Sequence, residues 1–157
     1  MKKKLSVGAW ITCLAAVLTL ISLIVYFINV GGTGYFHNIE VKNLVLFSIL
    51  VIVMLLCAII LKTLDIGGAA GRAVDLVSGA LQIGAAVLLA IILINLISSR
   101  VEGLAFIYFS NADVIKEVQT AENLASATTT IADMVLYGVS LIFAIVGSFC
   151  SLRKKNS

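Results

Sequence analysis

Four long stretches without a charged residue set what this chain can fold into. They occupy residues 5–39, 43–61, 76–99 and 134–152. Each is close to or above the roughly 20 apolar residues that an α-helix needs to cross a bilayer core. Of the 157 residues, 61% are hydrophobic and only 12% are charged. No segment shows the alternating pattern of an outer-membrane barrel strand. The sequence therefore predicts a helical membrane protein.

The expected fold is all-α: a polytopic membrane protein whose four transmembrane helices form a bundle with a short helical outer cap. A single membrane domain covers residues 1–157, with helices at about 5–30, 43–61, 76–99 and 131–152. The outer segment covers about 100–130. Within it, Ser110 or Asn111 is expected to cap a short helix, and Thr120 a helix that continues into the fourth span.

Lysine and arginine counts predict the orientation, because short cytoplasmic loops carry an excess of both. Eight lie on one side of the predicted membrane: Lys2, Lys3, Lys4, Lys62, Arg72, Arg153, Lys154 and Lys155. Three lie on the other side: Lys42, Arg100 and Lys116. Both termini are therefore expected in the cytoplasm, in a multi-pass protein of the cell membrane.

The first predicted helix carries a stripe of small and polar residues that we call the helix-one seam. Its members are Gly8, Thr12, Ala15, Thr19, Ser22, Tyr26 and Asn29. They recur at alternating spacings of four and three, which is the 3.5-residue period of a left-handed helix–helix contact. Small residues let membrane helices approach closely, and hydroxyls can bond across the contact. The seam is expected to pack within the bundle or, alternatively, against another membrane protein.

The motif YFxN occurs three times, at residues 26–29, 35–38 and 108–111. All three copies are expected at the outer interface. One interpretation is an aromatic belt at the headgroup level, with the asparagines ending helices or capping turns. The other is an outer aromatic cluster that binds a neutral polar solute or a partner's loop. Its members would be Tyr35, Phe36, Asn38, Tyr108, Phe109 and Asn111.

The sequence contains no arrangement that indicates catalysis. Its single histidine, His37, and its three cysteines lie in different predicted segments, so neither a metal site nor a nucleophilic triad is expected. The glycine-rich loop at residues 62–75 lacks the ending of a phosphate-binding loop. The four long uncharged runs leave no ionisable carboxylate, amine or guanidinium in the middle of a span, which disfavours proton-driven transport. We expect no enzyme activity, no cofactor, no metal and no nucleic-acid partner.

The stretch ISSRVEGLAFIYFSNADVIKEVQTAENLASA, with its flanking helices, resembles small uncharacterised four-helix integral membrane proteins of Gram-positive bacteria. The resemblance runs over most of the chain. It implies a bacterial plasma membrane and brings no functional residues, because no activity is assigned to those proteins.

Two functions remain open from the sequence. The first is an accessory or interaction subunit of a larger membrane assembly, whose partner is another membrane protein or a second copy of this chain. The alternative is a channel or carrier for a neutral polar solute such as a sugar.

Overall fold

The computed structural model describes residues 6–63 and 68–150, and its described part is helical without strands. The five helices are α1 (Val7–Gly31), α2 (Leu44–Thr63), α3 (Gly68–Phe109), α4 (Ala112–Val118) and α5 (Ala121–Phe149). All except α4 are long and apolar enough to cross a membrane, by length and composition.

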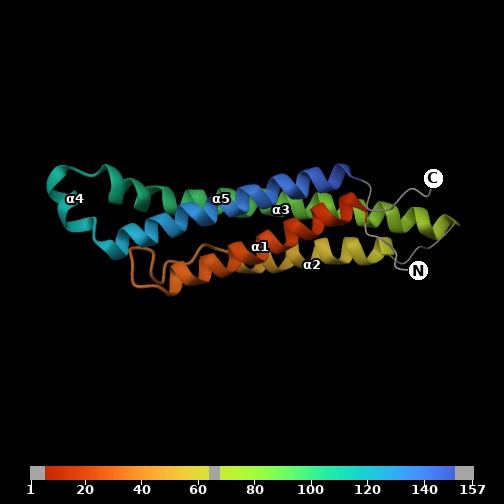
Figure 1. Ribbon diagram of the computed structural model, residues 1–157, viewed down its shortest axis with the longest axis horizontal. Coiled ribbons are helices and arrows are strands. Elements are labelled where there is room, and N and C mark those ends of the chain that lie inside the picture. Colours follow the sequence, from red (N-terminus) through yellow and green to blue (C-terminus); the bar gives the residue numbers. More distant parts are fainter. Residues whose placement is uncertain (1–5, 64–67, 151–157) are drawn as a thin grey trace.

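The four long helices run side by side (Figure 1), in the order α1, α2, α3, α5 around a ring. In this ring α1 packs on α2 and α5, and α3 packs on the same two helices. The connection between α1 and α2 lies at the same end as α4 (Figure 1), which we call the tip end. The N- and C-terminal ends of the described chain lie toward the opposite, terminal end.

The longest helix, α3, has 42 residues, or about 63 Å at 1.5 Å per residue. A bilayer core is only about 30 Å thick. Its uncharged run, residues 76–99, is long enough to fill that core, so α3 extends past it at both ends. Beyond the core at the tip end, α3 turns through α4 into α5.

Two stripes of the same period face each other between α1 and α5. All seven residues of the helix-one seam are buried. On α5 the matching buried stripe is Ser126, Thr130, Asp133, Tyr137, Ser140, Ala144 and Gly147. Asn29 bonds Thr130 near the tip end, and Thr12 lies beside Gly147 at the other. The two contacts are separated by 17 positions on each helix, so the stripes stay in register along the antiparallel pair.

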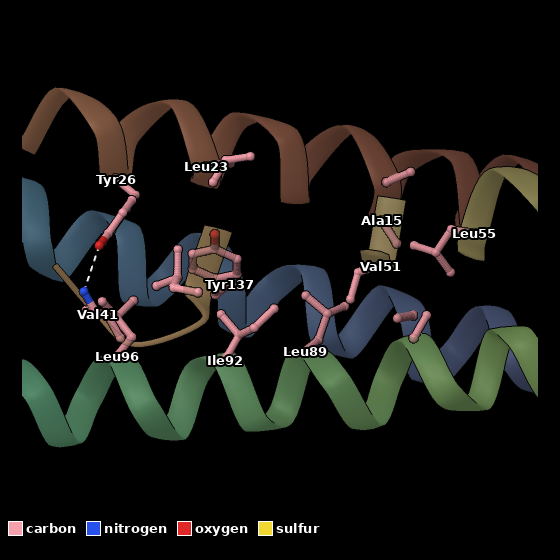
Figure 2. Close-up of a cluster of buried hydrophobic side chains, with 14 residues drawn as sticks. Ala15, Leu23, Tyr26, Val41, Val51, Leu55, Leu89, Ile92, Leu96 and Tyr137 are labelled. Atoms are coloured by element: carbon pink, nitrogen blue, oxygen red, sulfur yellow. Dashed lines mark hydrogen bonds between the residues drawn. The ribbon is translucent and has the colours of Figure 1, made fainter. Parts of the chain in front are cut away.

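Apolar side chains fill the space inside the ring. Figure 2 shows Ala15 and Leu23 of α1, Val51 and Leu55 of α2, and Leu89, Ile92 and Leu96 of α3 pointing into one shared core. Most of these side chains are fully buried. Many large apolar residues lie on the outside instead, which is the pattern of helices surrounded by lipid.

The observed helix bounds differ from the predicted ones where a charge was read as the end of a span. The first two helices begin and end within two residues of their predicted bounds. The third was expected at 76–99, but α3 begins at Gly68, passes through Asp75 and Arg100, and ends at Phe109. The fourth span was expected at 131–152 on a helix that starts after Thr120, and α5 does begin at Ala121 and continues into that span. Residues 5, 151 and 152, at the ends of predicted helices, lie outside the described residues.

The predicted caps of the tip end are confirmed. The side chain of Asn111 accepts a hydrogen bond from the backbone N–H of Val114 and starts α4. The hydroxyl of Thr120 accepts one from the N–H of Asn123 and starts α5. Each cap satisfies a donor that would otherwise lack a partner at a helix start.

Candidate functional site

The connection between α1 and α2, residues 32–43, packs between the tip-end parts of α3 and α5. Its Phe36 is fully buried in a cluster with Ile107 of α3 and Ala127 of α5. Two glycines make room for it. A Cβ on Gly103 would lie 2.7 Å from ring carbons of both Tyr35 and Phe36. A Cβ on Gly34 would lie 2.3 Å from the Cβ of Ser126. Each close approach therefore requires glycine.

The asparagines of the three YFxN copies have three different roles. Asn29 lies inside the ring, where its amide donates to the hydroxyl of Thr130 and accepts from that of Ser126. Asn38 adopts a left-handed backbone conformation, with φ of 57°, in the connection. Asn111 caps α4. The copies therefore share a sequence but not a structural environment.

The outer aromatic cluster comes together only in part. Tyr35, Phe36 and Tyr108 belong to one apolar cluster around Ile107. The rings of Tyr35 and Phe36 meet edge to face, with centroids 5.2 Å apart. Phe109 lies outside this cluster and is 85% exposed. The side chains of Asn38 and Asn111 are exposed, the first beside His37 and the second at the start of α4.

Two charged residues that the sequence placed at span boundaries lie buried inside the ring. Arg100 of α3 is 0% exposed and Asp133 of α5 is 1% exposed. Arg100 donates from Nη2 to the carbonyl of Ile39 at 2.5 Å. Its guanidinium carbon lies 4.6 Å from the ring centroid of Phe36, within the range of a cation–π contact. We expected these charges at the ends of the spans, but α3 continues through Arg100 and α5 contains Asp133, so each helix carries a buried charge.

The buried charges are incompletely paired. Nε and Nη1 of Arg100 and Oδ1 of Asp133 have no hydrogen-bond partner among the described residues. Arg100 on α3 and Asp133 on the neighbouring helix α5 attract each other electrostatically. None of these three atoms forms a hydrogen bond with the other residue. An ionised group in such a place is costly to desolvate. Arg100 and Asp133 therefore lie buried with part of their hydrogen-bonding capacity unused.

The spacing of Arg100 and Asp133 along their helices could have predicted that both are buried. Arg100 continues the buried stripe of α3 that includes Leu89, Ile92 and Leu96. Asp133 occupies a regular position of the buried stripe on α5. A reading based on the heptad position, not on charge alone, would have placed both inside the ring.

Further polar contacts cross the ring from one helix to the helix diagonally opposite. The hydroxyls of Ser48 on α2 and Tyr137 on α5 are 2.8 Å apart. Gln82 on α3 donates to the hydroxyl of Thr12 on α1 at 2.9 Å. It also lies 3.2 Å from the carbonyl of Gly147. These bonds satisfy polar groups internally and fix the relative rotation of the helices.

The tip end exposes a surface that is both apolar and acidic, which we call the tip surface. Its residues are Glu102, Phe106, Phe109, Asp113, Glu117 and Glu122. Phe106 is 42% exposed. The nearby exposed Lys116 supplies one positive charge. Phe109 lies nine residues beyond Arg100, or about 14 Å farther along the helix axis.

Among residues 6–63 and 68–150, no group of three histidine, cysteine or acidic side chains is close enough to hold a metal ion. No protein family matches the sequence, and neither a curated protein nor a solved structure matches it. Function must therefore be argued from the arrangement of the side chains themselves.

Proposed function

We propose that the chain is a multi-pass protein of a bacterial plasma membrane, with both termini in the cytoplasm and the tip end outside. The distribution of lysine and arginine supports this orientation. The four long apolar helices support the membrane location. Trp10, near the terminal end of α1, is 64% exposed, as expected for an indole ring at a membrane interface.

We infer that the protein is a non-enzymatic interaction subunit of a larger membrane assembly, and that the tip surface is its contact. The observation that carries this proposal is Phe109, which is 85% exposed at the end of a helix that projects past the lipid. Exposed apolar side chains that are rimmed by polar residues mark contact sites for proteins or membranes. Such side chains are frequent energetic centres of protein interfaces.

The charge of the tip surface defines the partner. Four exposed carboxylates lie on α3, α4 and the start of α5 at the tip end, where the two phenylalanines also lie, and Lys116 is the exposed basic residue of α4. A negative rim favours a positively charged partner and disfavours an anionic lipid surface. The occupant we propose is an outer loop of a second membrane protein, with Lys or Arg beside an apolar pocket that receives Phe109.

The helix-one seam is a weaker candidate for this contact, because all its members are buried against the other helices. The solute carrier or channel is also supported less well. Side chains fill the ring along its axis, and Tyr35, Phe36 and Tyr108 pack on each other at its tip end.

The test is purification from native membranes in a mild detergent at native expression, followed by mass spectrometry. The wild-type chain should copurify with a stoichiometric membrane protein. Phe109→Ser should lose that protein, whereas Phe149→Ser should keep it. Phe149 is a matched control because it is 87% exposed at the opposite end of the bundle. Recovery of the chain alone, or equal loss in both variants, would refute a contact at the tip surface.

A further inference from the structure

Arg100 and Asp133 lie close enough inside the ring to attract each other electrostatically, but they do not bond directly. Each side chain is almost fully buried. A direct ion pair would bring a guanidinium nitrogen and a carboxylate oxygen within 4.0 Å, and these two described residues form none. Two buried polar groups that are attracted to each other across such a separation are commonly joined by a bridging water.

The two side chains offer complementary hydrogen-bonding atoms. Nη2 of Arg100 donates to the carbonyl of Ile39, and the ring of Phe36 covers the guanidinium. Nε and Nη1 each carry hydrogen but have no acceptor among the described residues. Oδ1 of Asp133 can accept but has no donor there. A molecule that accepts from Arg100 and donates to Asp133 would therefore satisfy both ends.

Tyr26 of α1 supplies a third polar group. Its side chain points into the space between the helices (Figure 2), where its hydroxyl accepts from the N–H of Val41 at 2.8 Å. Because the hydroxyl is the acceptor in that bond, its own proton is still able to donate. Tyr26 also interacts electrostatically with Arg100. Arg100, Asp133 and Tyr26 together offer about three partners, the usual number for a buried water.

The position of the pair limits what can bind between its members. Arg100 is 0% exposed and Asp133 is 1% exposed, so a ligand must be small enough to be enclosed by the helices. An anion would be repelled by the carboxylate of Asp133, and a cation by the guanidinium of Arg100. The ligand is therefore small and neutral and both donates and accepts hydrogen bonds, which describes water.

We propose that an internal water molecule bridges Arg100 and Asp133 inside the ring. Its oxygen accepts from Nε or Nη1 of Arg100, and one of its protons bonds Oδ1 of Asp133. The water supplies hydrogen bonds that the helices do not, so it reduces the cost of keeping both charges within the bundle. This proposal does not depend on the partner of the tip surface.

Solid-state NMR of the full chain in lipid bilayers tests the site by measuring the magnetisation that passes from water to labelled side-chain nitrogens. The chain contains three arginines and two glutamines, so labelling these residue types gives few signals. The side chain of Arg100 should receive magnetisation from water although it is buried. The amide of Gln82 is the matched control, because it is buried in the same ring and donates to Thr12 and Gly147. It should receive none. No transfer to Arg100, or equal transfer to Gln82, would overturn a defined water site.

A second measurement tests the other end of the bridge. The chain contains four aspartates, and with labelled aspartate the carboxyl carbon of Asp133 should receive magnetisation from water as well. Transfer to Arg100 without transfer to Asp133 would refute the bridge. These two measurements use the wild-type chain, so they decide the question even where a variant does not fold.

Two variants show whether Asp133 holds the water. Asp133→Leu removes the acceptor and should reduce the transfer from water to Arg100. Asp113→Leu changes an exposed carboxylate of α4 and should leave that transfer as in the wild type. Unchanged transfer in a folded Asp133→Leu protein, or the same reduction in both variants, would contradict the proposal.

Discussion

Asn29 on α1 donates a hydrogen bond to the hydroxyl of Thr130 on α5, although 101 residues separate them in the sequence. The carbonyl oxygen of the same amide accepts a bond of 2.8 Å from the hydroxyl of Ser126. That hydroxyl lies 3.3 Å from the backbone N–H of Phe36, which donates to it. One buried amide therefore links α1, the connection to α2, and two turns of α5.

Replacing Thr130 by valine should destabilise the protein by about 1–2 kcal/mol, because the amide of Asn29 then lacks an acceptor in a buried place. Thr128→Val is the control, since the hydroxyl of Thr128 bonds only the carbonyl of Leu124 in its own helix. The measurement is the free energy of unfolding in mixed micelles. Similar values for the two variants would show that the link to α5 contributes little.

Adding a methyl group at Gly34 should be more harmful than adding one at Gly31. A Cβ at Gly34 would lie 2.3 Å from the Cβ of Ser126 and 2.6 Å from the carbonyl oxygen of Glu122. A Cβ at Gly31 meets nothing within 4 Å. Gly34→Ala should cost about 1–3 kcal/mol, because the connection must move away from α5.

Thermal unfolding in detergent checks this expectation, with Gly31→Ala as the control. If both alanine variants unfold at the same temperature as the wild type, the connection does not pack against α5 as described.

The buried charges of Arg100 and Asp133 should behave as a coupled pair. Arg100→Leu or Asp133→Leu alone should cost about 3–5 kcal/mol, because each leaves the other charge buried without compensation. The double variant should cost clearly less than the two single losses together. A double-mutant cycle measures this coupling, and simple additivity would mean that the two residues act independently.

The proposed orientation predicts which ends of the helices a membrane-impermeant thiol reagent reaches. In a background without Cys13, Cys57 and Cys150, Phe109→Cys should react in intact cells when the partner is absent. Thr63→Cys, at the terminal end of α2, should react only after the cells are made permeable. The reverse pattern would invert the topology.

Periodicity in the sequence was sufficient to identify the buried face of α1. A helix that only faces lipid rarely has small and polar residues at heptad spacing, so the helix-one seam predicted a packed face. The spacing could not predict which helix packs against this face of α1. The bonds of Asn29 to Ser126 and Thr130 join distant parts of the chain, and such pairings depend on how the helices are arranged in space.

Charge defined the long apolar runs of the sequence but was a poor guide to the ends of the third helix. Arg100 and Asp133 do end the uncharged runs of α3 and α5. Both helices continue past these residues: Arg100 bonds the carbonyl of Ile39 and lies over the ring of Phe36, and Asp133 is buried as well. Charge alone does not show that these side chains are buried, whereas their positions on the buried stripes of α3 and α5 do indicate it.

The outer aromatic cluster could also be predicted only in part from the sequence. Sequence repetition suggested that the YFxN copies act alike, and three of the six predicted residues do share one apolar cluster. Phe109, the last residue of α3, lies outside this cluster and is 85% exposed. A four-residue sequence repeat does not determine whether its aromatic side chains are buried or exposed.

The most direct test of the account is photo-crosslinking in living cells, with a photoreactive phenylalanine at position 109 and, separately, at position 149. Position 109 should give one predominant product. The crosslinked peptide should come from an outer loop of another membrane protein and contain Lys or Arg. Position 149 should not give that product. Crosslinks from position 109 only to lipid, or the same products from both positions, would contradict the proposed role of the tip surface.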